Sequence, residues 1–209
     1  MKKILFFLFF LTACDRDKSV QENDTHAVDA QETVQHNDDK DNVDDEQPLG
    51  VIAADDCQQI NLGDKACNIR LYDQNNNVWD LYDHMGDVVV IDFSAAWCGP
   101  CQMAADYTQA LQNDYEDKGV QVVTVLIDGP TGGVAPTEQD IDNWVIRHNI
   151  TTAPILRGSR DYIIDYTGIG GYNLAAFPTY LYIDRNMKFY AGHTGYSDEV
   201  AREKIEEAL

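Results

Sequence analysis

Two uninterrupted apolar runs stand out in the middle of the chain. Residues 88–93 (VVVIDF) and 120–127 (VQVVTVLI) are rich in β-branched side chains, which predicts strands buried on both faces of a sheet. Between them, apolar positions recur at helical spacing over residues 98–118, and Gly119 is a suitable C-terminal stop. The pattern therefore predicts a strand–helix–strand unit.

Weaker patterns extend this unit in both directions. Ahead of it, an Asp- and Asn-rich turn between two short apolar stretches predicts a hairpin at residues 67–81, and behind it Thr137 with Asp140 in the capping-box position predicts another helix. The remaining predicted segments are one helical turn, a short strand in an irregular stretch, a hairpin and a last helix, at residues 81–85, 162–166, 179–191 and 198–209. Together they predict an α/β fold, a mixed central β-sheet flanked by helices, with an N-terminal β-hairpin extension.

The N-terminus has the pattern of a targeting segment. Lys2 and Lys3 precede an apolar run at residues 4–11 (ILFFLFFL), which is too short to span a bilayer. Small residues and a cysteine follow, and this order predicts a secretory signal peptide over residues 1–13. A buried core segment is the alternative, but the polar stretch that comes next gives the run no local partner.

Residues 11–14 (LTAC) resemble the bacterial lipobox. The resemblance implies that Cys14 is lipidated, becomes the new N-terminus and anchors the protein to a bacterial membrane. Asp15 either resembles an inner-membrane retention signal or is one more acid in an acidic stretch. The implied location is extracytoplasmic, on the periplasmic face of a membrane, with the inner membrane as one option.

Charge separates a tail from a domain. The chain carries 36 Asp and Glu against 15 Lys and Arg, a net charge of -21. Residues 14–50 are acidic and nearly free of large apolar side chains, which predicts a disordered tether behind the lipid-bearing cysteine. Residues 51–209 are long enough for one domain with a sizeable core. The net charge argues against nucleic-acid binding, which needs a basic surface.

Four cysteines remain in the predicted domain. Cys98 and Cys101 lie together at a predicted helix start and form a natural pair, which leaves Cys57 and Cys67 for a structural disulfide at the entry to the domain. An even number of cysteines suits an exported protein. A four-cysteine zinc site is the alternative, but the interval between Cys57 and Cys67 is too wide for one, so no metal is expected.

The cysteine pair lies within residues 97–101 (WCGPC), between a buried strand and a helix start. Cys98 there meets unpaired backbone N–H groups and the positive end of the helix dipole, so we expect a low thiol pKa and a nucleophilic thiolate. Pro100 suits the first helical turn, where its missing N–H is not needed. Cys101 is one turn further in, close enough to resolve a mixed disulfide.

The surrounding residues resemble a known family. Residues 91–101 (IDFSAAWCGPC) resemble the thioredoxin active-site segment, with Asp92 six residues ahead of the first cysteine, and Phe177, Pro178 and Thr179 resemble its cis-proline loop. The added hairpin and lengthened middle are similar to the membrane-anchored TlpA and ResA type within the redoxin (AhpC/TSA-like) superfamily. The resemblance implies a thioredoxin fold.

The resemblance also implies roles for individual residues. Cys98 attacks the substrate disulfide, Cys101 resolves the mixed disulfide, and Asp92 accepts the Cys101 proton. An ordinary structural aspartate is the alternative for Asp92, but burial in so apolar a run is costly without a role or a partner. The residues implied in substrate binding are Trp97, Gly99, Pro100, Phe177 and Pro178, with a cis bond before Pro178. Two departures from thioredoxin are Thr124 in place of a central-strand lysine and Gln102 in place of a lysine after the second cysteine.

These observations predict an exported, membrane-tethered thiol–disulfide oxidoreductase that reduces disulfides of extracytoplasmic client proteins. The expected partners are a disulfide-containing client protein, an upstream membrane electron donor and, through the lipid anchor, a membrane. No cofactor is expected besides the redox-active Cys98–Cys101 disulfide, and the chain is expected to be a monomer. The Gly-Pro dipeptide resembles that of reducing thioredoxins, while an oxidase or isomerase role stays open.

Two other functions within the superfamily are alternatives. A peroxiredoxin-like antioxidant enzyme would have threonine where Ala95 stands. A non-enzymatic copper metallochaperone would use a CxxxC pair with a distant histidine. His148 and His193 are present, but the cysteine spacing differs.

Overall fold

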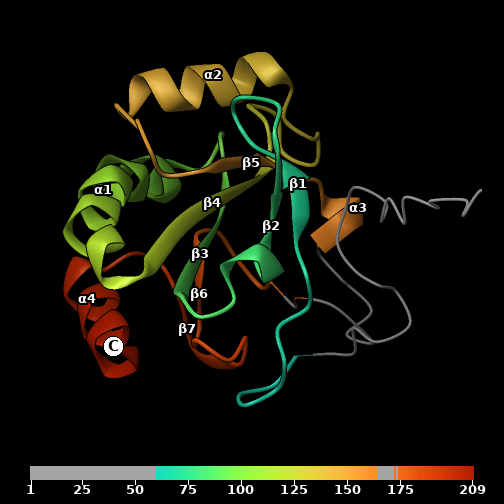
Figure 1. The fold of residues 1–209 in the computed structure, drawn as a ribbon. Helices are drawn as coiled ribbons and strands as arrows, with labels where there is room; N and C mark the ends of the chain where they lie inside the picture. Colours follow the sequence, from blue (N-terminus) through green and yellow to red (C-terminus); the bar gives the residue numbers. More distant parts are fainter. Residues whose placement is uncertain (1–59, 164–171, 173) are drawn as a thin grey trace, which may run out of the picture. The chain divides into compact units, whose positions relative to one another are not determined.

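The computed structural model describes residues 60–163, 172 and 174–209. They belong to the second of the two units into which the chain divides, Glu46–Leu209. Its centre is a five-stranded sheet in the order β5-β4-β3-β6-β7 (Figure 1). The strands are β3 Val88–Ala95, β4 Val120–Asp128, β5 Ile155–Arg157, β6 Thr179–Ile183 and β7 Phe189–Thr194. The sheet is mixed, as predicted, because β3, β4 and β5 run parallel whereas β6 and β7 are each antiparallel to their neighbours.

The longer helices pack through apolar stripes. The long helices are α1 Gly99–Tyr115, α2 Glu138–Arg147 and α4 Asp198–Ala208. A short helix, α3, covers Arg160–Ile163. α1 and α4 share one core cluster with β3, which includes Leu111, Ile205 and Val90. α2 joins the first turns of α1 in another cluster, which includes Trp144 and Ala105. The predicted helical spacing after the cysteine pair is therefore confirmed.

The N-terminal hairpin covers the opposite face of the sheet. It consists of β1 Arg70–Tyr72 and β2 Val78–Asp80, and the 3-10 helix η1 Leu81–His84 follows it. Leu71 and Trp79 share a core cluster with Ile91 and Phe93 of β3. Since successive side chains of a strand face opposite sides, Val90 faces α1 and α4 while Ile91 and Phe93 face the hairpin. This confirms the prediction of a strand buried on both faces.

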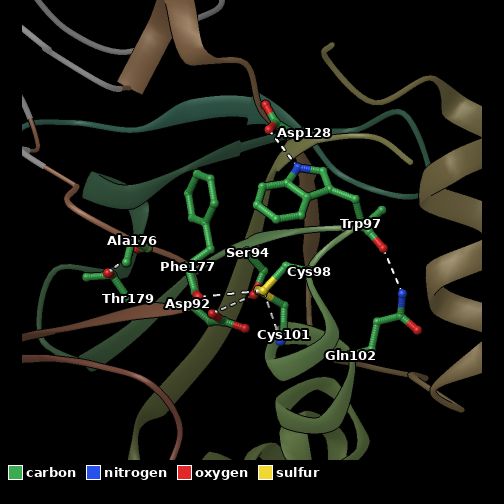
Figure 2. The surroundings of a disulfide bond; sticks show 11 residues. Asp92, Ser94, Trp97, Cys98, Cys101, Gln102, Asp128, Ala176, Phe177 and Thr179 are labelled. Atoms are coloured by element: carbon green, nitrogen blue, oxygen red, sulfur yellow. Dashed lines mark hydrogen bonds between the residues drawn. A yellow bond between two sulfur atoms is a disulfide. The ribbon is translucent and has the colours of Figure 1, made fainter. Parts of the chain in front are cut away.

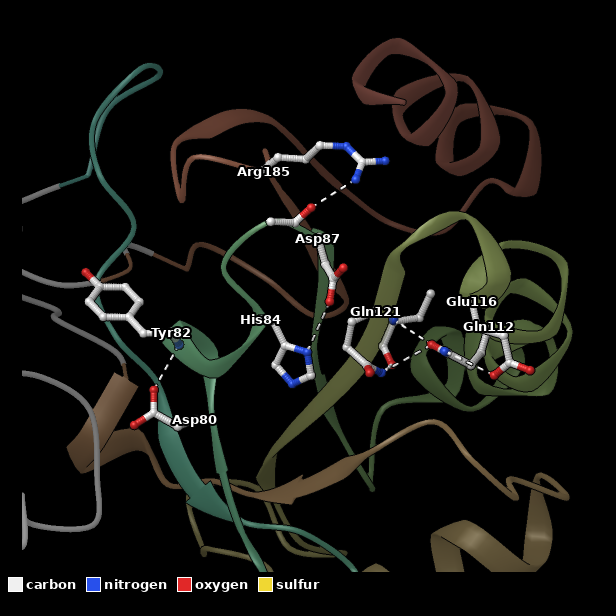
Figure 3. A network of polar contacts seen from close by, with 10 residues as sticks. Asp80, Tyr82, His84, Asp87, Gln112, Glu116, Gln121 and Arg185 are labelled. Carbon is white, nitrogen blue, oxygen red and sulfur yellow. Dashed lines mark hydrogen bonds and ion pairs between the residues drawn. The ribbon is translucent and has the colours of Figure 1, made fainter.

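Two glutamine side chains satisfy backbone groups of the sheet. In the hairpin turn, Gln74 donates from Nε2 to the carbonyl oxygen of Ala153 at 3.2 Å, and its Oε1 accepts the N–H of Ile155 at 2.8 Å. On α1, the buried Gln112 accepts the N–H of Val122 at 2.7 Å (Figure 3). The first pair of bonds joins the hairpin to the edge of the sheet, and the second joins α1 to β4.

Local sequence signals mark the start of α2 and the end of the helical segment that contains α1. The side chain of Thr137 accepts the N–H of Asp140, whose carboxylate in turn accepts the N–H of Thr137, so the capping box of α2 is confirmed. Gly119 has a positive φ of 75° and follows η2, a 3-10 turn at Glu116–Lys118. α1 itself ends at Tyr115, so the predicted helix over residues 98–118 is an α-helix whose last turn is a 3-10 helix.

The stretch between α2 and β6 differs from the prediction. β5 has only three residues and was not predicted, because its pairing with β4 is a long-range contact that leaves no local pattern. The strand expected at residues 162–166 is wrong at its start, since residues 162 and 163 belong to α3. Ser159 favours this helical turn by accepting the N–H of Asp161 at 3.1 Å. Residues 164–166 lie outside the described residues.

Several predicted features also lie outside the described residues. These are the signal peptide, Cys14, Asp15, the acidic tether and Cys57. Cys67 is buried, and its predicted disulfide with Cys57 stays a prediction. None of the helices in the described part of the chain is long and apolar enough to cross a membrane.

Candidate active site

The predicted cysteine pair lies where β3 leads into α1 (Figure 2). Cys98 is the N-cap residue of α1 and forms a disulfide with Cys101 in the first turn. The Sγ atom of Cys98 accepts the backbone N–H of Cys101 at 3.2 Å. Cys101 is fully buried and Cys98 is 4% exposed, so Cys98 is the more accessible sulfur. The N-terminal end of the helix thus directs one of its free backbone donors, the N–H of Cys101, at the sulfur that a partner reaches first.

The loop before β6 brings backbone groups to the same sulfur. The Phe177–Pro178 peptide bond is cis, as expected. The carbonyl oxygen of Phe177 lies 3.6 Å from Cys98 Sγ, and Thr179 Oγ1 donates to the carbonyl oxygen of Ala176 at 2.7 Å. A pocket of about 420 Å³ opens here, and its walls include Trp97, Cys98, Gly99, Pro100, Arg160 and Phe177. Four of the five residues predicted to bind substrate therefore line one pocket, and the fifth, Pro178, is buried and does not line it.

Asp92 lies on β3 next to the disulfide, with 1% of its surface exposed (Figure 2). Its register neighbours are Thr124 on β4 and Tyr180 on β6, and Ser94 Oγ donates to its Oδ1 at 2.8 Å. Burial raises the pKa of Asp92 to about 7, and the hydroxyl groups of Ser94, Tyr180 and Thr124 offset only part of that rise. The carboxyl group can therefore both accept and donate a proton near neutral pH.

A second buried carboxylate, Asp128, was not predicted. It ends β4 with no exposed side-chain surface, and its Oδ2 accepts the indole N–H of Trp97 at 2.8 Å (Figure 2). Arg160 donates from Nε to Oδ1 at 2.7 Å and from Nη2 to Oδ2 at 2.5 Å, and the N–H of Gly133 donates to Oδ2 at 2.9 Å. Burial raises the pKa of Asp128, but these donors and the charge of Arg160 outweigh it, so the pKa falls below its usual value.

Trp97 connects the two halves of the site. Its ring meets Phe177 edge-on, with 6.4 Å between ring centroids, while its indole nitrogen is held by Asp128. The position of Asp128 directly after an apolar run is the sequence signal that could have revealed it, although it is weaker than that of Asp92, which stands inside such a run. The two histidines considered for metal binding lie elsewhere: His148 pairs with Asp106 at 2.7 Å, and His193 stacks on Tyr180.

Comparison with known proteins agrees with this geometry. The family model "AhpC/TSA family" matches residues 62–191. The chain belongs to the AhpC/TSA family. Among relatives of this redoxin, the thiol–disulfide oxidoreductase ResA of Oceanobacillus iheyensis is 29% identical over 136 residues, which cover 63% of this chain and 64% of that protein. ResA of Geobacillus kaustophilus is 25% identical over 150 residues, 72% of this chain and 77% of the relative.

A solved structure extends the likeness to the fold. The crystal structure of a protein described as a thiol:disulfide interchange protein DsbE, from Chlorobium tepidum, superposes with a TM-score of 0.56 and 27% sequence identity. The superposition covers 71% of this chain and 98% of that protein. The AhpC/TSA chain thus has the thioredoxin fold of the ResA type and is a thiol–disulfide oxidoreductase.

Proposed function

We propose that this redoxin is an exported, lipid-anchored reductase that reduces disulfides of extracytoplasmic client proteins. One observation carries the proposal. The Cys98–Cys101 disulfide is at the start of α1, with the outer sulfur facing a pocket and the inner sulfur fully buried. That arrangement gives the two sulfurs different access, which suits one for attack and the other for resolution.

The first step is attack by Cys98 in the reduced protein. The N–H of Cys101, 3.2 Å from Sγ, and the positive end of α1 stabilise the Cys98 thiolate. This thiolate attacks one sulfur of the client disulfide, so the client S–S bond breaks and a mixed disulfide forms. The leaving client thiolate takes up a proton from solvent.

The second step is resolution by Cys101. Asp92, with a pKa of about 7, is ionised in part of the molecules at neutral pH and accepts the proton of the Cys101 thiol. The Cys101 thiolate then attacks Cys98 Sγ, which restores the Cys98–Cys101 disulfide and releases the second client thiolate. Two electrons have passed to the client, and an upstream dithiol donor at the membrane reduces the Cys98–Cys101 disulfide again while being oxidised to a disulfide itself.

The loop before β6 supports the binding of an extended client chain. The carbonyl oxygen of Phe177 is adjacent to Cys98 and accepts no backbone hydrogen bond among the described residues. A client N–H can pair with it and hold the client cysteine over Cys98, as an added strand pairs with a sheet edge. Trp97, Gly99 and Pro100 form the apolar walls of that position.

The location rests on the sequence. A signal peptide over residues 1–13, a lipidated Cys14 and an acidic tether to residue 50 would hold the domain of residues 51–209 away from a membrane surface. Asp15, the next residue, resembles a signal for retention in the inner membrane. The alternative interpretation is that Asp15 is simply one of the acidic residues of the tether. The proposal treats the chain as a monomer that needs no cofactor besides its own disulfide.

The test is insulin-disulfide reduction with dithiothreitol as electron source, using the full-length protein. We expect turnover in the wild type and none in Cys98→Ser, because the attacking sulfur is lost. Cys101→Ser is the matched control: reduced beforehand, freed of dithiothreitol and then mixed with insulin, it keeps the attack and should accumulate a mixed disulfide that non-reducing electrophoresis detects. Equal rates for the wild type and Cys98→Ser would remove the assignment of Cys98.

A further inference from the structure

A second groove lies on the other side of Trp97 from the Phe177 pocket. It has a volume of about 560 Å³ and runs between the start of α1 and α2, and its walls include Ala96, Trp97, Gln102, Trp144, Ile146 and Arg147. We call it the α2 groove. Because Trp97 belongs to both hollows, the α2 groove continues the surface that surrounds Cys98.

Two apolar side chains of the α2 groove, Ile146 and Trp97, are open to solvent. Ile146 is 73% exposed and Trp97 is 48% exposed. Ile146 lies on the outer side of α2, whereas Ile141 and Trp144 of the same helix are buried in the core. An exposed apolar surface that continues from a reactive disulfide is typical of a site that contacts a partner.

The groove also contains a positioned positive charge. Arg147 donates from Nη1 to Gln102 Oε1 at 2.9 Å, and Gln102 Nε2 donates to the carbonyl oxygen of Ala96 at 2.7 Å. These acceptors are neutral, and no ion pair of Arg147 with a carboxylate occurs within the described residues. Asp140, the carboxylate in the groove wall, is two turns away on α2 and is engaged by Thr137.

This charge stands out against the composition of the chain. With 36 acidic and 15 basic residues, the protein as a whole repels anions. Arg147 is held by neutral partners in a groove that shares Trp97 with the Cys98 pocket. It therefore gives this groove an attraction for anions that the acidic remainder of the protein lacks. A carboxylate is the complementary group, since the guanidinium can bind it through two parallel hydrogen bonds.

We propose that the α2 groove binds the continuation of the client chain, with an apolar client residue against Ile146 and Trp97 and an acidic client residue at Arg147. The inference rests on the proposed function and adds the substrate class: unfolded client segments in which an apolar and an acidic residue accompany the reactive cysteine. Pairing at the Phe177 carbonyl fixes the cysteine, and the α2 groove selects the sequence beside it.

The test compares three disulfides with the full-length protein. Two are peptide disulfides that differ only in an aspartate or an asparagine beside an apolar residue near the cysteine, and the third is the small neutral hydroxyethyl disulfide. We expect the wild type to reduce the aspartate peptide about two- to five-fold faster, in kcat/KM, than the asparagine peptide, the size of an exposed ion pair. Rates are expressed relative to hydroxyethyl disulfide.

Three variants separate the groove from general charge. Arg147→Glu should reverse the preference for the aspartate peptide. Arg157→Glu changes the net charge equally, but Arg157 pairs with Glu138 and is not in the groove wall, so the preference should stay. Ile146→Ser should slow both peptides by the same factor, and because Ile146 is exposed this variant is expected to fold.

The outcomes distinguish the possibilities. A wild type that reduces hydroxyethyl disulfide but treats both peptides alike, or an Arg157→Glu variant that behaves like Arg147→Glu, overturns the inference and leaves the proposed function standing. A gain of activity on both peptides in Arg147→Glu would mean that acidic residues of the chain itself occupy the α2 groove. A wild-type dimer that dissociates in this variant would mean that a second copy of the chain occupies the groove. Either outcome overturns the inference. A wild type inert toward all three disulfides overturns the proposed function as well.

Discussion

Asp92 and Asp128 are carboxyl groups on neighbouring strands, and both are almost completely buried. Their pKa values nevertheless move in opposite directions. The partners of Asp92 in the described part of the chain are hydroxyl groups, so burial dominates and its pKa rises to about 7. Asp128 faces burial as well, but the guanidinium of Arg160 and two further donors lower its pKa. Burial makes the ionised form of both carboxyl groups unfavourable, and only the carboxyl group with a cationic partner stays fully ionised at neutral pH.

The difference makes opposite predictions for stability against pH. A carboxyl group with a raised pKa in the folded state stabilises the fold below its ordinary pKa near 4, and that contribution is lost as the pH rises through about 7. A carboxyl group with a lowered pKa stabilises the fold above its ordinary pKa, and that contribution is lost as the pH falls through the lowered value. Asp92 therefore contributes most to the free energy of unfolding at acidic pH, and Asp128 contributes most at neutral pH.

The largest expected effect is that of Asp92→Asn. Because the pKa of Asp92 is raised from 3.8 to about 7, the wild type loses up to about 4 kcal/mol of unfolding free energy between pH 4 and pH 8. The asparagine amide does not ionise, so the variant does not lose it. We expect the oxidised variant to be more stable than the wild type at pH 8. Urea unfolding at several pH values measures this. Asp142→Asn, at an exposed carboxylate, is the control, and parallel pH profiles for wild type and Asp92→Asn would contradict the role of burial.

Arg160→Met should have the next largest effect, with the opposite sign. It leaves Asp128 buried beside two uncharged donors, and removing one partner of a buried pair costs about 3–5 kcal/mol. Because the Arg160 side chain is one-third exposed, we expect a smaller loss, about 1–3 kcal/mol at pH 7. Urea unfolding of the oxidised protein measures the loss. Adding Asp128→Asn should recover part of it, and no recovery would show that the uncompensated charge is not the cause.

Trp97→Phe should have the smallest effect of the three. It removes the indole N–H from Asp128 but leaves Arg160 and the N–H of Gly133, so about 1 kcal/mol of unfolding free energy is expected. The midpoint of urea unfolding at pH 7 detects such a change. A loss as large as that of Arg160→Met would mean that the ring, through its packing on Phe177, contributes more than its hydrogen bond.

The parts of the molecule that the sequence predicts are those with dense local signals. β3 is a continuous apolar run, α1 has an apolar stripe and a proline in its first turn, and the capping box of α2 occupies four successive residues. The cysteine pair and Asp92 belong to the same short segment, so their proximity follows from one strand and one helix. The cis bond before Pro178 was expected from the resemblance to thioredoxin, and no local rule predicts it.

The unpredicted parts depend on contacts between distant residues. Asp128 and Arg160 are 32 positions apart, and nothing near either residue specifies the other. β5 is a strand because β4 and the side chain of Gln74 form hydrogen bonds with its backbone. Locally, Pro154 directly before it favours a loop. In each case the interaction that determines the local structure forms between residues that are distant in sequence. Periodicity and propensity, which depend on neighbouring residues, therefore do not predict it.

The bonds from Gln74 to Ala153 and Ile155 have a consequence for neighbouring molecules. β5 ends the sheet, and the exposed rim of a sheet is a template on which another chain can add a strand and begin to aggregate. A single amide group occupies one donor and one acceptor of that rim, so the hairpin acts as a barrier to such growth as well as a cover for the core.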